Sequence, residues 1–70
     1  MNQFETICAH LASLDYFPHL HRRRADWQCE LYTGKLKTVP SGTGATVLDA
    51  LLAADAERKR LEKDRRYKAA

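Results

Sequence analysis

Cysteine and histidine are the residues of this chain with the widest chemical repertoire, because thiolates and imidazoles can bind metals or act in catalysis. They are Cys8, His10, His19, His21 and Cys29. Zinc ligands usually come in pairs spaced as C-x2-C or H-x3-H, a spacing that none of these residues has. Only His19 and His21 would share one face of a strand, so we predict no metal site and no cofactor.

The same residues offer one conceivable nucleophile, Cys29, with a histidine as its base. The alternation of apolar and polar residues around Cys29 directs its thiol toward the core, and no acidic residue completes a triad. A chain of 70 residues is also short for enclosing a pocket of about 300 Å³ or more. We therefore expect no enzymatic activity.

A glycine-containing segment, Gly42-Thr43-Gly44-Ala45-Thr46, precedes a predicted helix whose N-terminus could bind an anion. The segment lacks the Gly-Lys-Ser/Thr end of a phosphate-binding loop and the third glycine of a dinucleotide fingerprint. We interpret it as a flexible connection.

Arginines are the candidate binding residues. Three adjacent arginines lie on an extended segment, where they could contact phosphates or acidic side chains. A second basic group near the C-terminus is interleaved with acidic residues, a pattern typical of a solvated helix face. The predicted contacts with a partner are Arg22, Arg23, Arg24, Tyr32, Arg58, Arg65 and Arg66.

Two helices are predicted to flank these residues. Asn2 and Glu5 form a capping-box pattern. Apolar residues then recur at three- and four-residue spacing: Phe4, Ile7, Cys8, Leu11 and Leu14. This spacing predicts an amphipathic helix over 3–14, which Pro18 would prevent from continuing.

The second helix is predicted to begin after Thr46, a favourable N-cap. Its residues are mainly apolar up to Ala56 and mainly charged beyond it, with opposite charges four residues apart. The chain would therefore form one compact domain over 1–57, followed by a projecting charged helix end over 58–70.

The middle of the chain predicts strands. Residues 17–24 could form an edge strand or an extended basic loop. Trp27, Cys29 and Leu31 alternate with polar residues, which predicts a half-buried strand.

Thr33-Gly34 predicts a two-residue turn. Folding back over this turn pairs Tyr32 with Lys35, Leu31 with Leu36, Glu30 with Lys37 and Cys29 with Thr38. The following Pro40–Gly44 segment is predicted to be a loop.

The predicted fold class is α+β, in the order α-β-β-β-α, or α-β-β-α if residues 17–24 form a loop. Both helices would pack on one face of a small antiparallel sheet. The predicted core consists of Phe4, Ile7, Leu11, Trp27, Leu31, Leu36, Leu48 and Leu51. A homodimer would add stability to so small a core.

The element order resembles the double-stranded-RNA-binding domain, which enters its second helix through G-x-G-x-S-K-K-x-A-K. The small and capping positions of that motif match Gly42, Gly44, Thr46 and Ala50. Apolar residues stand where that family has its phosphate-binding lysines: Val47, Leu48 and Leu51. The resemblance therefore implies the topology and not the same RNA-binding mode.

Residues 27–56 resemble small phage and prophage accessory proteins in their Trp-led strand, hairpin, Gly-x-Gly-x-Thr link and Ala/Leu-rich helix. This resemblance implies a protein made in an infected bacterium and located in the host cytoplasm. It also implies that the protein binds and blocks a host component, such as a defence nuclease.

Composition is consistent with one small domain: 44% of the 70 residues are hydrophobic and 30% are charged, with a net charge of +3. We expect no membrane segment, because no stretch approaches the ~20 apolar residues of a spanning helix, and no secretory signal. Two cysteines are too few for a disulfide framework, which favours reduced thiols in a cytoplasm. We expect a non-enzymatic protein that binds a host or viral protein. The alternative is nucleic-acid binding through Arg22–Arg24 and the basic C-terminal helix.

Overall fold

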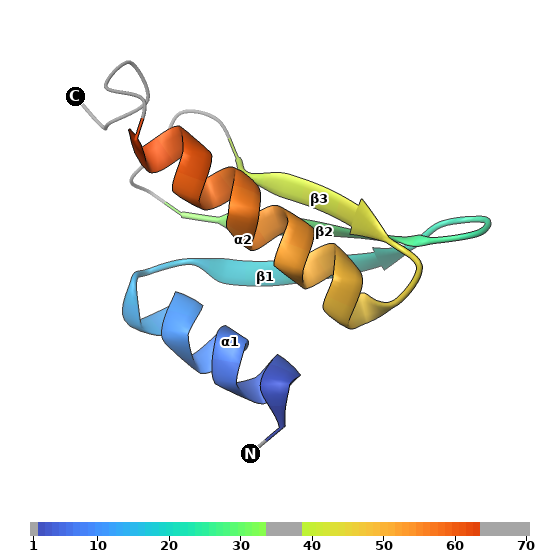
Figure 1. Cartoon of the computed structure of the whole chain (residues 1–70), viewed down its shortest axis with the longest axis horizontal. Helices are drawn as coiled ribbons and strands as arrows, with labels where there is room; N and C mark the ends of the chain where they lie inside the picture. The colour runs from blue at the N-terminus through green and yellow to red at the C-terminus, as the bar shows by residue number, and fades with distance from the viewer. Residues whose placement is uncertain (1, 34–38, 64–70) are drawn as a thin grey trace.

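The computed structural model describes residues 2–33 and 39–63. The elements follow one another as α1 (Gln3–Ser13), β1 (Phe17–Arg22), β2 (Trp27–Tyr32), β3 (Ser41–Gly44) and α2 (Val47–Lys63). The strands form one antiparallel sheet in the order β1-β2-β3, with α2 crossing β2 and β3 and α1 beside β1 (Figure 1). The predicted α-β-β-β-α fold is confirmed.

Helix α1 begins and ends with side-chain and backbone caps. The Asn2 side chain accepts a hydrogen bond of 2.8 Å from the Glu5 amide, and Glu5 accepts one of 3.2 Å from the Asn2 amide, which confirms the capping box. At the other end, Asp15 has a left-handed φ of 71°, and the Tyr16 amide donates to the Leu11 carbonyl at 2.9 Å. This Schellman-type turn ends the helix. Pro18 lies beyond it, inside β1.

The uncertain segment at residues 17–24 is a strand over Phe17–Arg22. Phe17 pairs with Tyr32, and Leu20 pairs with Cys29. A short loop joins β1 to β2, closed by a 2.8 Å hydrogen bond from the Arg23 amide to the Asp26 carbonyl.

The predicted partners of Cys29 and Glu30, Thr38 and Lys37, are wrong. Cys29 pairs with Gly42, four positions beyond Thr38, and Glu30 pairs with Ser41. The Leu31 amide donates to the Pro40 carbonyl at 2.9 Å. The predicted turn at Gly34 and the partners Lys35 and Leu36 lie outside the described residues. The partner strand is thus shifted by four residues from the predicted register. Because four is an even number, Cys29 and Leu31 still face the core, as predicted.

The glycines explain why β3 lies where a loop was predicted. A Cβ atom at Gly42 would lie 2.3 Å from the Ala54 nitrogen, and one at Gly44 would lie 2.5 Å from the Asp49 Cβ. Both distances are shorter than any tolerable contact, so glycine is required for α2 to pack this closely on β3. The helix begins as predicted: the Asp49 amide donates to Thr46 Oγ1 at 3.1 Å.

The core lies between the two helices and one face of the sheet. Its fully buried cluster consists of Leu11, Tyr16, Cys29, Leu31, Ala50, Leu51 and Ala54. Of the predicted core, Leu11, Leu31 and Leu51 are thus confirmed. Those packed against the cluster but only partly buried are Phe4, Ile7 and Trp27. Leu48 is also only partly buried.

The charged end of α2 contains buried as well as exposed residues. Arg58 is 4% exposed and Leu61 is 2% exposed. Lys59, Arg60 and Lys63 are exposed, so this part of the helix has one buried and one solvated side, and the boundary at residue 58 between domain and projecting end stays a prediction. Neither α1 nor α2, as far as the structure describes them, has the length and apolar content that crossing a membrane requires.

Candidate interaction surface

The described parts of α1 and α2 pack on one face of the sheet, and neither lies over the other face. Leu20, Cys29 and Leu31 point toward the helices. Because side chains alternate along a strand, the opposite face carries a different set, which we call the open face: Phe17, His19, His21, Gln28, Glu30, Tyr32, Ser41 and Thr43. Except for Gln28 and Glu30, which are half-buried, these residues are exposed.

Aromatic rings gather at one end of the open face. Phe17 and Tyr32 are directly paired across β1 and β2, and they are 52% and 42% exposed. The His19 ring meets the Tyr32 ring edge to face, with centroids 4.5 Å apart and planes at 73°. We call these three residues the aromatic cluster. Contiguous exposed apolar surface is a common feature of sites that bind another molecule.

Glu30 organises the polar part of the open face. Its Oε1 atom accepts a 3.3 Å hydrogen bond from the Tyr32 hydroxyl and lies 3.1 Å from His21 Nε2. The nearby Glu30 carboxylate raises the pKa of Tyr32, so the phenol remains a neutral donor. Among the described residues of this face, Glu30 is the only Asp, Glu, Lys or Arg.

The predicted arginines do not lie with Tyr32. The guanidinium of Arg22 lies over the Trp27 ring at 5.5 Å from its centroid, at the end of the hairpin opposite Tyr32. Five residue steps of about 3.3 Å place the two ends roughly 17 Å apart. Arg23 Nε lies 3.6 Å from Asp26 Oδ1, and Arg24 is exposed in the same loop.

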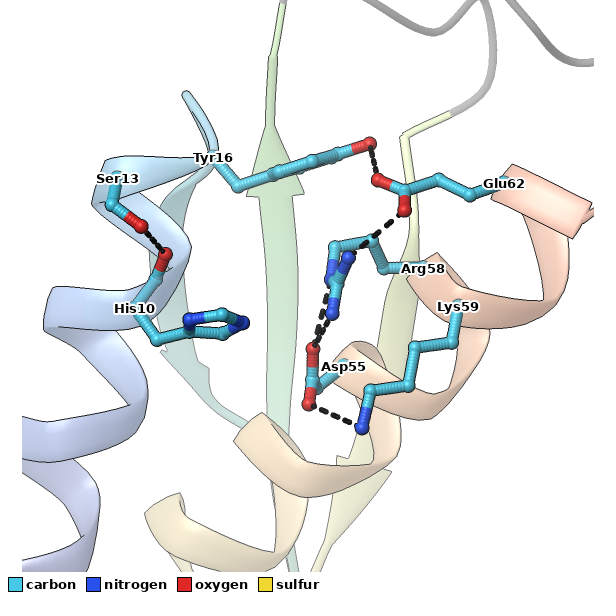
Figure 2. Close-up of polar contacts among 7 residues, drawn as sticks. All are labelled: His10, Ser13, Tyr16, Asp55, Arg58, Lys59 and Glu62. Carbon is cyan, nitrogen blue, oxygen red and sulfur yellow. Dashed lines mark hydrogen bonds and ion pairs between the residues drawn. The ribbon is translucent and has the colours of Figure 1, made fainter.

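Arg58 is buried and belongs to a partly buried network of hydrogen bonds (Figure 2). Its Nε donates to Asp55 Oδ1 at 2.8 Å, and its Nη1 donates to Glu62 Oε1 at 3.0 Å. The Tyr16 hydroxyl donates to Glu62 Oε2 at 2.7 Å, and the Arg58 guanidinium lies 5.6 Å from the Tyr16 ring centroid. We call these four residues the Tyr16–Arg58 network. Arg58 is thus engaged inside the molecule, and Arg65 and Arg66 lie outside the described residues.

The cysteines are poorly suited to nucleophilic chemistry. Cys29 is fully buried. Its burial, with smaller contributions from Cys8 and Glu30, raises the pKa of its thiol to about 11. Burial also raises the pKa of Cys8. Both thiols are therefore protonated at neutral pH, the unreactive form. In residues 2–33 and 39–63, acidic, histidine and cysteine side chains nowhere gather in a group of three that could hold a metal ion.

Two site features escaped the sequence analysis. Phe17 was not selected, although its alternation with His19 and His21 was a readable signal once a strand over residues 17–22 was accepted. Tyr16 was not selected either, because its partners Arg58 and Glu62 are distant in sequence. Comparison of the chain with protein-family models, curated proteins and solved structures found no match.

Proposed function

We propose that this protein is a non-enzymatic binding protein that recognises another protein through its open face. The observation that carries the proposal is the exposed pair Phe17 and Tyr32, side by side on a sheet face that no described helix covers. Aromatic residues are enriched among those that dominate binding energy at protein interfaces. Burying a side chain of the size of Phe contributes about 1.5–3 kcal/mol.

The charge of the open face favours a protein over a nucleic acid. Among the described residues of this face, the only Asp, Glu, Lys or Arg is the acidic Glu30. Protein surfaces that bind nucleic acid are instead lined by Lys and Arg. Arg22 and Arg23 already contact Trp27 and Asp26. The arginine-rich loop could still strengthen attachment to an acidic region of a protein partner.

The resemblance to phage accessory proteins suggests where to seek this partner. A small phage protein of this kind would act in the cytoplasm of a bacterial host, by covering a surface that a host component needs. Blocking a surface in this way requires a complementary shape and sufficient affinity but no catalytic group, which is consistent with the protonated thiols of Cys8 and Cys29.

Affinity capture from nuclease-treated bacterial lysate tests the proposal. The wild-type chain is compared with Phe17→Ala and Tyr32→Ala, and Leu52→Ala is the matched control because Leu52 is a 38% exposed apolar residue on α2. A captured protein should be lost, by tenfold or more in retained amount, with either open-face variant and retained with the control.

Equal capture by all variants would reject the open face as the binding surface. Capture that disappears after nuclease treatment would instead support nucleic-acid binding. In that case, the affinity for DNA duplex of random sequence should fall as salt concentration rises. A plot of log affinity against log salt concentration should have a slope of about −0.9 for each phosphate that the protein neutralises.

A further inference from the structure

Strand β3 forms one border of the sheet, opposite β1 and α1 (Figure 1). Hydrogen-bonded residue pairs alternate with non-bonded pairs in an antiparallel ladder. The Leu31 amide bonds the Pro40 carbonyl, so the pairs Cys29–Gly42 and Trp27–Gly44 are also of the bonded kind. The backbone groups of Gly42 and Gly44 therefore face β2. The backbone amides and carbonyls of Ser41 and Thr43, the alternate residues of the strand, therefore point away from the sheet.

Apart from its short length, this border lacks the features that usually prevent strands from joining. Within the described residues, no backbone bond involves the outward amide or carbonyl of Ser41 or Thr43. β3 contains no proline and no charged side chain, whereas the other border strand, β1, contains Pro18 and lies beside α1. Proline, charge and covering elements are the common means of protecting an edge.

We propose that β3 pairs with β3 of a second copy of this chain, giving a two-fold symmetric dimer with a continuous six-stranded sheet. The symmetry axis passes beside Gly42. Ser41 then bonds Thr43 of the second copy, and Thr43 bonds its Ser41, so that all four outward amides and all four outward carbonyls of the two edges are used. The pairing is antiparallel, as a two-fold axis perpendicular to the sheet requires.

The flank of α2 above β3 suits the same arrangement. The Ala53 Cβ lies 2.6 Å from where a Cβ of Gly42 would be, so Ala53 packs over Gly42, beside the proposed axis. Glu57 and Arg60 follow on this side of the helix at four- and three-residue steps. They are joined by hydrogen bonds of 2.6 and 2.9 Å. A two-fold axis there sets this flank of α2 against the same flank of an antiparallel copy, with the small Ala53 nearest the junction and the Glu57–Arg60 pairs of the two copies on opposite sides of the axis.

A second copy fits this edge better than a foreign peptide. Ser41 and Thr43 are placed symmetrically about Gly42, which is what self-pairing needs, and their short side chains form no specificity pocket of the kind used in strand addition. A domain of 70 residues also gains from the extra burial. Because the paired segment is short, the dimer should dissociate on dilution.

Sedimentation equilibrium across protein concentrations of about 1 μM to 1 mM tests the dimer, a range that brackets ordinary weak association. The decisive variant is Thr43→Pro, which deletes an amide that points away from β2 and so leaves the monomer's ladder intact. We expect wild type to dimerise and Thr43→Pro to weaken dimerisation at least tenfold. Thr43→Ser is the matched control and should dimerise as wild type does. Thr43→Lys, which places a charge at the edge without altering the backbone, is the second variant should proline impair folding.

Hydrogen exchange identifies the surface involved. The amides of Ser41 and Thr43 should become protected only at concentrations where the dimer forms. A chain that stays monomeric throughout would overturn the proposal. So would a dimer that Thr43→Pro and Thr43→Lys leave unchanged but that Phe17→Ala abolishes, since the second copy would then occupy the open face.

Discussion

At the scale of single residues, Arg58 shows how a charged side chain can be buried in a small domain. Two carboxylates, Asp55 and Glu62, bind its guanidinium, and the Tyr16 ring covers it. Lys59 Nζ lies 3.5 Å from the second oxygen of Asp55. Every buried side-chain polar atom in the described part of the chain has a partner. Removing Arg58 would deprive Asp55, whose side chain is 13% exposed, of its shorter ion pair, so the network is costly to break.

Arg58→Ala should therefore lower the free energy of unfolding by about 3 kcal/mol or more. Arg60→Ala is the matched control. The Arg60 side chain is 63% exposed in its ion pair with Glu57, and exposed pairs contribute about 0–1 kcal/mol. Urea denaturation measures both changes. Equal losses in the two variants would show that burial of Arg58 adds nothing to stability.

The Tyr16 hydroxyl predicts sensitivity to alkali. Burial, together with the Glu62 carboxylate, raises the pKa of Tyr16 from 10.0 to about 12. A folded-state pKa above the unfolded value means that the hydroxyl contributes stability fully below pH 10 and that this contribution falls as pH approaches 12. The raised pKa of the Cys29 thiol likewise makes the free energy of unfolding fall as pH rises from 9 to about 11.

Stability measured by urea denaturation should thus fall steadily from pH 9 upward. Tyr16→Phe should be less stable than wild type at pH 8 by about 1 kcal/mol, the usual value of one hydrogen bond. It should also lose less stability than wild type between pH 10 and pH 11. Parallel profiles for the two proteins would contradict the assigned role of the Tyr16 hydroxyl.

At the scale of elements, the contact between α2 and β3 sets the geometry of the sheet. Ala50 and Ala54 on the helix are fully buried against a strand whose inward positions are both glycine. Small residues on both sides bring the helix axis close to the strand. The position of β3, and with it the register of β2, depends on this close approach.

Gly42→Ala should accordingly destabilise the fold by about 3 kcal/mol, at the upper end of the usual cost of overpacking, because the added methyl meets backbone atoms that cannot rotate away. Ser41→Ala is the control on the same strand, since Ser41 is exposed and its substitution should stay within about 0.5 kcal/mol. Thermal unfolding followed by circular dichroism measures both. A Gly42→Ala protein as stable as the control would show that the helix can shift outward freely.

Local patterns predicted the elements well and their partners poorly. The alternation around Cys29 and Leu31 identified β2 and its core face, because alternation depends only on neighbours in the chain. The register failed because the Thr33-Gly34 turn signal is also local, whereas the pairing with Gly42 is decided by α2. Tyr32 was correctly expected to be exposed. Arg58 was expected in solvent because its charge spacing is that of a surface helix, and only the distant Tyr16 ring and the core reveal its burial.

At the scale of the whole molecule, the two helices are held unequally. Helix α1 contributes one fully buried residue, Leu11, whereas α2 contributes five. The α1–β1 turn is fastened to the end of α2 through the bond from Tyr16 to Glu62. Regions with less burial open more readily than the core.

In native-state hydrogen exchange, the amides of α1 should therefore exchange faster than those of β2 and the middle of α2, because less free energy is needed to open α1 locally. Tyr16→Phe should accelerate exchange in α1 more than in β2. Uniform exchange across all elements would indicate a single cooperative unit and would contradict this ranking.

The glycines of β3 also determine how descendants of this sequence can diverge. Surface arginines can be exchanged freely while the backbone keeps its shape, but Gly42 and Gly44 are tied sterically to the alanines that pass above them. Distant relatives should therefore share a Gly-x-Gly strand and, eight and twelve residues after its first glycine, small residues matching Ala50 and Ala54. Such a fingerprint would trace ancestry even where every binding residue has been replaced.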